Sequence, residues 1–241
     1  MMKAMLSSPP MPNTDLQDSA GRSPTKARVW DLPTRLFHWG TVCLVALSWI
    51  TAENGLMSWH LWSGTALLTL LIFRLAWGVI GSTTARFSHF VTHPQIVIGY
   101  IKSLMRGIEN LSYPGHNPAG GWMVVALIVI LSLQASTGLF ANDGVHFNGP
   151  LAMLVGGETS DRLTELHGIL FKIILTLVWC HVVAVGFYML VKGENLVQPM
   201  FTGEKDAAKL PGGQNLRFIH PLVALAVWAL VAGFVWWMVR P

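Results

Sequence analysis

The sequence predicts an all-α integral membrane protein: a bundle of four transmembrane helices, joined by a fifth at the carboxyl terminus and by an amphipathic helix on the cytoplasmic surface. Two observations support this fold class. The chain of 241 residues is 52% hydrophobic and only 12% charged, whereas soluble domains carry about 25% charged residues. Five stretches are also apolar over the length of about 20 residues that a helix needs to cross a bilayer. The length leaves no room for a separate soluble catalytic domain.

The elements follow in order along the chain. Residues 1–29 are rich in Pro, Ser, Asp and Lys and contain no apolar core of a signal peptide, so we expect a flexible cytoplasmic tail. Asp31 and Pro33 indicate the start of the first helix. A membrane domain is expected over residues 30–200, a cytoplasmic linker over 201–216 and the fifth transmembrane helix within 217–241. The predicted spans cover about residues 34–52, 59–80, 121–141, 163–191 and 219–238.

The connection after the second span contains one further helix. Residues 93–108, HPQIVIGYIKSLMRGI, place apolar side chains at helical spacing and Lys102 and Arg106 on another side. This pattern is typical of an amphipathic helix lying on a membrane surface.

The basic residues predict the orientation of the spans. Twelve Lys and Arg residues belong to the tail and to the connections after spans two and four, whereas only Arg162 and Arg240 belong to the opposite side. Because cytoplasmic loops carry the excess of positive charge, we expect the amino terminus in the cytoplasm and the carboxyl terminus in the periplasm. The protein would then be a multi-pass protein of a bacterial cytoplasmic (inner) membrane. The same distribution explains the net charge of +4 without nucleic-acid binding.

The fourth span carries two histidines, His167 and His181, fourteen residues apart. In a helix this spacing leaves the two imidazoles within about 40° of one face and separates them by roughly 21 Å, most of the hydrocarbon thickness. Such a helix can offer metal ligands at two depths of the membrane, as a helix shared by two stacked haems would.

Two further histidines lie near helix ends and match these depths. The predicted topology puts His38 and His181 at the cytoplasmic level and His60 and His167 at the outer level. We therefore expect the pair His38 and His181 to bind the iron of an inner haem, and the pair His60 and His167 that of an outer haem. Two nitrogen ligands leave each iron six-coordinate, which favours electron transfer over substrate chemistry. The alternative for each histidine is a hydrogen-bonded packing residue, but polar side chains at membrane depth are rare.

Three residues near these histidines have two interpretations each. Arg74 follows His60 by fourteen residues, so it could pair with a haem propionate or a quinone head group at the inner level, or extend to the cytoplasmic interface. Gly64, one turn from His60, offers clearance for a flat macrocycle or for helix packing. Lys172 points away from both expected haems and is assigned to another span or to the interface.

The remaining histidines and the cysteines receive no assigned role. His89, His93, His116, His146 and His220 belong to connections or helix starts, with His116 and His146 as weak candidates for propionate or partner contacts. Cys43 and Cys180 lie in apolar segments and are expected to be free thiols. No C-x-x-C-H motif occurs, which excludes covalent c-type haem attachment.

Several stretches resemble the prokaryotic cytochrome b561 family, which includes the cytochrome b subunits of nickel–iron hydrogenases. They are VWDLPTRLFHW, WHLWSG with RLAWGVIGSTTARFSHF, GHNPAGGWM, LTELHGILFKIILTLVWCHVVAVGFY and ENLVQPMFTG, within residues 28–205. The resemblance implies two b haems held by histidines of spans one, two and four, which match His38, His60, His167 and His181. The amino-terminal tail is not part of the pattern, and the fifth span resembles the hydrogenase-type subunits.

These observations favour a dihaem electron-transfer subunit that links a periplasmic redox partner, a hydrogenase or a c-type cytochrome, with a quinone or another acceptor. Whether a quinone is bound and whether the chain forms an oligomer are left open. One alternative is a stand-alone quinol-linked oxidoreductase acting on a small species such as superoxide. The other is a non-redox transporter, which usually shows broken spans or internal repeats. Ferric-reductase or quinol–cytochrome c reductase chemistry expects two helices with paired histidines, and only one is present.

Overall fold

The computed structural model describes residues 26–108, 112–145, 147–211 and 215–240. Five of its helices are long and apolar enough to cross a membrane. They are α1 (Leu32–Glu53), α2 (Met57–Ile80), α5 (Pro118–Leu139), α6 (Gly157–Leu190) and α8 (Pro221–Val239). The shorter elements are β1 (Lys26–Arg28), η2 (Thr83–Ala85), α3 (Phe87–Phe90), α4 (Pro94–Met105), η3 (Ala152–Leu154), α7 (Val197–Thr202), β2 (Glu204–Asp206) and η4 (Ala207–Lys209). The chain is therefore an all-α membrane protein.

The helix starts follow from local sequence. Asp31 and Asn117 precede helices α1 and α5, and each side chain accepts a hydrogen bond from a backbone N–H in the first turn. Histidines take the same position before α4 and α8. All four helices have proline in the first turn, where its missing N–H costs nothing.

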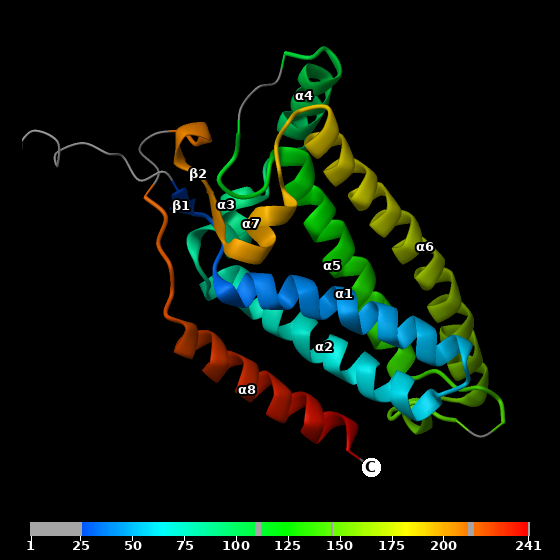
Figure 1. Cartoon of the computed structure of the whole chain (residues 1–241). Helices are drawn as coiled ribbons and strands as arrows, with labels where there is room; N and C mark the ends of the chain where they lie inside the picture. Colours follow the sequence, from blue (N-terminus) through cyan, green and yellow to red (C-terminus); the bar gives the residue numbers. More distant parts are fainter. Residues whose placement is uncertain (1–25, 109–111, 146, 212–214, 241) are drawn as a thin grey trace, which may run out of the picture.

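The transmembrane helices form two antiparallel hairpins, α1 with α2 and α5 with α6 (Figure 1). The hairpins meet in a core cluster of Leu67, Leu71, Leu131 and Ile174, contributed by α2, α5 and α6. Helix α8 packs on α2, where Ala224 joins a second cluster with Phe73 and Trp77. Helix α2 is thus the centre of the bundle, and half of its apolar window is buried.

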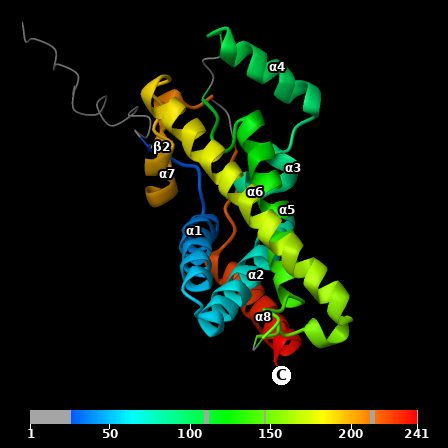
Figure 2. The same cartoon turned by 90° about the vertical axis from the view of Figure 1, so that its right-hand side faces the viewer.

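Helix α6 lies at the edge of the bundle and crosses the view in Figure 2 as one long rod. Only Ser160, Leu170 and Ile174 are buried along its 34 residues. The helix begins at Gly157, six residues before the predicted start of the fourth span. The prediction began where the apolar run begins, but Glu158 and Arg162 add a polar first turn, joined by an exposed ion pair of 2.6 Å.

The expected tail ends earlier than predicted. Residues 26–28 form strand β1, which pairs antiparallel with β2 in the expected linker, Ala27 opposite Lys205. The backbone N–H groups of Val29 and Trp30 both donate to the carbonyl of Gly203. These long-range backbone bonds cannot be read from polar composition, which is why the prediction missed them. The rest of the tail lies outside the described residues.

A helix occupies the segment predicted to lie on the membrane surface: α4 ends at Met105, three residues earlier than predicted. Ile96, Ile98, Ile101 and Met105 are exposed along it, whereas Tyr100 is buried. In the predicted orientation, the inner (cytoplasmic) end of the bundle carries β1, β2, α3, α4 and α7, and the outer end carries the two hairpin turns.

Candidate functional site

The structure brings together four histidines in two pairs. The ring centres of His38 on α1 and His181 on α6 are 6.5 Å apart at the inner end. Those of His60 on α2 and His167 on α6 are 6.1 Å apart at the outer end. Each pair joins the first hairpin to α6, in the combination that the matching depths predict. All four side chains are half-buried.

The ring separations fit a metal ion between two imidazoles. A metal–nitrogen bond is about 2.0–2.1 Å long, and the ring centre lies about 1.1 Å beyond the nitrogen. Two opposed imidazoles on one ion are therefore roughly 6 Å apart from centre to centre. No group of three or more His, Cys, Asp or Glu that could hold a metal occurs among the described residues, so each pair needs further ligands from elsewhere. A haem supplies four nitrogens of its own.

The outer pair is oriented by backbone carbonyl groups. The Nδ1 of His60 lies 2.8 Å from the carbonyl oxygen of Ser48 on α1. The Nδ1 of His167 lies 3.0 Å from the carbonyl oxygen of Gln134 and 3.2 Å from the hydroxyl of Thr137, both on α5. A carbonyl only accepts hydrogen bonds, so both imidazoles carry their proton on Nδ1 and leave the Nε2 lone pair for a metal.

A serine pair holds the first of these carbonyls in place. The hydroxyls of Ser48 and Ser63 are 2.7 Å apart, and Ser63 donates to the carbonyl of His60 itself. The contact links α1 to α2 at the level of the outer pair. It therefore fixes both the ring of His60 and its acceptor.

The ring of His167 is closely surrounded by α5. A Cβ atom added at Gly138 would lie 2.9 Å from its Cε1. The side-chain nitrogen of Gln134 lies 2.9 Å from its Nε2. An iron bound at this nitrogen would displace the side-chain nitrogen of Gln134. The amide oxygen of Gln134 is buried without a hydrogen-bond partner among the described residues, so rotation of the amide would break no bond of the oxygen.

The inner end contains most of the unsatisfied polar atoms. Of nine buried side-chain N and O atoms without a hydrogen-bond partner in the described chain, eight lie there. They belong to Thr34, Arg35, His38, Thr41, Arg74, Arg86, Thr92 and His116. Buried polar groups are normally satisfied, so this cluster indicates a missing acidic or polar ligand. Haem propionates have the chemistry that its cationic members need.

Arg74 is the buried cation of this cluster. Its side chain is 2% exposed. Of the two interpretations given by the sequence, extension to the cytoplasmic interface therefore does not fit the structure. The guanidinium carbon lies 5.0 Å from the ring centre of Phe87, 5.9 Å from that of Phe37 and 6.0 Å from that of Phe90. Its Nη1 has no partner in the described chain. The buried carboxylate of Asp31 attracts Arg74 electrostatically, but no ion pair joins the two among the described residues, so the guanidinium can still bind a further anion.

Two further residues named in the sequence analysis are Gly64 and Lys172. A Cβ added at Gly64 meets open space, consistent with clearance beside His60. Lys172 is exposed on α6, and its backbone carbonyl accepts a hydrogen bond from the hydroxyl of Thr176. His93 and His220 cap helices, and His146 lies outside the described residues.

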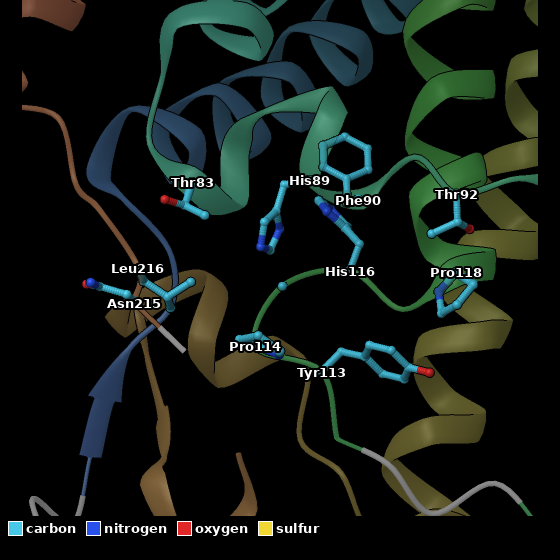
Figure 3. A pocket seen from close by; sticks show the side chains of 11 residues that line it. Thr83, His89, Phe90, Thr92, Tyr113, Pro114, His116, Pro118, Asn215 and Leu216 are labelled. Carbon is cyan, nitrogen blue, oxygen red and sulfur yellow. The ribbon is translucent and has the colours of Figure 1, made fainter. Parts of the chain in front are cut away.

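A cavity of about 350 Å³ opens at the inner end between the segment that follows α2 and the loop before α5. Figure 3 shows His89, Phe90 and His116 converging on it, with Tyr113 and Pro114 across the opening. The ring of His116 packs against Trp30 and Phe90 at 4.7 and 4.6 Å. Burial, and then the positive charge of Arg74, lower the pKa of His116 to about 3, so this imidazole is neutral at physiological pH. Burial and Arg86 also lower the pKa of His89.

The sequence prediction missed the contribution of α5 to the site. Gln134 and Thr137 contact His167, yet the third span was assigned no functional residue. A glutamine within an apolar span is a signal that could have indicated the contact, because an amide at membrane depth needs a partner. The hydrogen bond from the indole N–H of Trp77 to the carboxylate of Asp31 was also missed.

Fold and site together define a multi-pass membrane protein with paired histidines facing one another across its helices, a class that holds haem within the bilayer. The family model described as prokaryotic cytochrome b561 matches residues 29–203. The chain belongs to this family, as the sequence motifs indicate. It is therefore a membrane protein that transfers electrons through haem b. A comparison with curated proteins gives no match.

Proposed function

We propose that the chain binds two b haems and carries electrons between the two faces of the bacterial inner membrane. His38 and His181 bind the inner iron, and His60 and His167 bind the outer iron. The observation that carries this proposal is the pair of ring separations, 6.5 and 6.1 Å. Both are close to the roughly 6 Å that two imidazoles on one metal ion require.

The inner end supports a haem with buried propionates. Arg74 is a buried cation whose Nη1 has no hydrogen-bond partner, and the Nδ1 atoms of His38 and His116 are buried without partners in the described chain. A carboxylate among these groups would satisfy several of them at once. Gly64 leaves open space on the outer side.

Six-coordinate iron has no free position, so the chain serves electron transfer rather than substrate chemistry. We propose that the outer haem exchanges electrons with a periplasmic redox protein, a hydrogenase or a c-type cytochrome. The excess of Lys and Arg at the inner end supports this orientation, with a cytoplasmic amino terminus and a periplasmic carboxyl terminus. Helix α4 then lies on the cytoplasmic surface, and α8 forms a fifth span beside the four-helix haem core.

The acceptor at the inner end is proposed to be a quinone. The cavity beside His116 has a volume of about 350 Å³, which falls in the range of small-molecule sites, about 300–1,000 Å³. Aromatic walls and a neutral histidine suit a ring with two carbonyl oxygens. The cavity also lies at the same end of the bundle as His38 and His181.

The test is the haem content of histidine variants. The purified protein should contain two haems per chain by reduced-minus-oxidised spectroscopy and iron analysis. His60→Ala should lose the outer haem and His38→Ala the inner one, each keeping the other. His93→Ala, an exposed helix cap, is the matched control and should keep both. A protein that binds no haem, or keeps both in either ligand variant, would refute the assignment.

A further inference from the structure

Helix α4 presents an exposed apolar face. The side chains of Ile98, Ile101 and Met105 are 53, 42 and 83% exposed. At about 100° per residue they lie within about 60° of one another, whereas the buried Tyr100 lies about 130° from the centre of that face. Contact with water is unfavourable for such a face, so it requires an apolar neighbour outside the chain.

A basic face adjoins the apolar one. Lys102 and Arg106 are both exposed; on the helix they lie about 40° apart and about 90° from the centre of the apolar face. Neither forms an ion pair with a described residue, and residues 81–108 contain no Asp or Glu. The positive charge is therefore not compensated within this segment. A neighbour that carries both an anionic group and apolar chains would satisfy the two faces together.

Two hydrogen bonds hold α4 at the inner boundary of the spans. Just before α4, the carbonyl of Thr92 accepts a hydrogen bond of 2.9 Å from the indole N–H of Trp122, near the start of α5. Within α4, the hydroxyl of Tyr100 is hydrogen-bonded to that of Tyr188, two residues before α6 ends at Leu190. Figure 1 shows α4 beside these inner ends of α5 and α6. Both bonds therefore lie where the apolar spans begin or end, which is the level of lipid head groups.

We propose that α4 binds anionic phospholipid, with the phosphate of the head group at Lys102 and Arg106 and the acyl chains against the apolar face. The inference rests on the surface placement of α4 proposed above and does not depend on haem binding. A water-soluble protein partner fits less well, because the apolar face lies at the level at which the acyl chains begin. Phe90 and Thr92, just before α4, line the cavity beside His116, so the bound lipid also supports one wall of that cavity.

The test is a titration of the purified, haem-loaded full-length protein in neutral detergent with dioctanoyl phosphatidylglycerol, followed by thermal unfolding. A ligand that binds the folded protein raises the unfolding midpoint. Dioctanoyl phosphatidylcholine supplies the same chains without net charge, and glycerol 3-phosphate supplies the anion without chains. Only the phosphatidylglycerol should raise the midpoint. No response to it, an equal response to the phosphatidylcholine, or a response to glycerol 3-phosphate would overturn the proposal.

Substitutions on the basic face locate the site. Each basic residue contributes roughly fivefold to the binding of anionic lipid at low salt, so Lys102→Gln combined with Arg106→Gln should weaken the apparent affinity about thirtyfold. The matched control is Lys26→Gln combined with Lys209→Gln, which removes the same charge from exposed positions at the inner end and should bind as the wild type does. Unchanged affinity in the first variant, or an equal loss in the control, would overturn the proposal.

A third variant tests the apolar face. Ile98→Gln combined with Ile101→Gln keeps the charge and removes two half-exposed apolar side chains, so it should weaken the affinity for phosphatidylglycerol about fivefold for each residue. Unchanged affinity would show that acyl chains do not contact this face and would refute the lipid assignment. The haem content of the same preparations tests the electron-transfer function separately, because none of the substituted residues lies in the histidine pairs.

Discussion

Asp31 is fully buried and connects the start of α1 to the centre of the bundle. One carboxylate oxygen accepts from the backbone N–H of Thr34 at 2.9 Å, which caps the helix. The other accepts from the indole N–H of Trp77 on α2, also at 2.9 Å. Trp77 is itself fully buried in the cluster that holds α8. Removal of this carboxylate therefore affects the cap and the core together.

The size of the effect follows from these two bonds. Loss of an N-cap to alanine costs about 1 kcal/mol, and a buried N–H left without an acceptor costs about 1–3 kcal/mol. We expect Asp31→Ala to lower the free energy of unfolding by about 2–4 kcal/mol. Asp31→Asn keeps one side-chain oxygen as acceptor for the two donors, the backbone N–H of Thr34 and the indole N–H of Trp77. It should therefore lower the free energy of unfolding by about 1–3 kcal/mol.

The assay is thermal unfolding in detergent, combined in a double-mutant cycle with Trp77→Phe. The phenylalanine removes the indole donor, so Asp31→Ala should cost only the cap in that background. A coupling of about 1–3 kcal/mol between the two positions is expected. Glu53→Ala, at the exposed far end of the same helix, should leave the midpoint unchanged. Additive effects of Asp31→Ala and Trp77→Phe would refute the reasoning.

Two further predictions concern one site residue at each end. Gly138→Ala places a Cβ 2.9 Å from Cε1 of His167, so it should reduce the occupancy of the outer haem and leave the inner haem bound. The control Gly99→Ala, where the added Cβ meets open space, should keep both haems. Equal loss of both haems in Gly138→Ala would contradict this geometry. Folding lowers the pKa of His116 from 6.5 to about 3. Between pH 6.5 and pH 3 the imidazole is therefore protonated in the unfolded chain but neutral in the folded protein. The free energy of unfolding should be highest above pH 6.5 and should decline as the pH falls below that value. By pH 5 the free energy of unfolding should have fallen by about 2 kcal/mol, measured by thermal unfolding at pH 5 and pH 7.5. His116→Gln should remove this part of the pH dependence. An unchanged pH dependence in that variant would contradict the burial of a neutral His116.

The parts of the fold that the sequence predicts are those governed by local chemistry. Asp31 and Pro33 mark the start of α1 within two residues of its predicted start, because a cap and a first-turn proline act over one helical turn. The parts that it does not predict depend on distant segments. Strand β1 exists because residues 204–206 return to it, and no pattern within residues 26–28 indicates that partner.

The same distinction applies to the candidate site. The histidine pairs follow from depth alone, since helical rise converts sequence position into level in the membrane. Their hydrogen-bond partners do not, because the carbonyls of Ser48 and Gln134 are present in every residue and only the packing of α1 and α5 brings them to an imidazole. A residue type can indicate a ligand, but it cannot indicate a backbone acceptor.

The levels of the two pairs are set by the short turn between α1 and α2. His38 lies fifteen residues before the end of α1, and His60 lies three residues after the start of α2. In an antiparallel hairpin these positions differ in height by about twelve residues of helix, or roughly 18 Å, and the two turn ends account for a little more. The spacing of His167 and His181 gives roughly 21 Å along α6. A hairpin with a three-residue turn and one uninterrupted helix therefore present the same two depths, so that both pairs can form together without bending any helix.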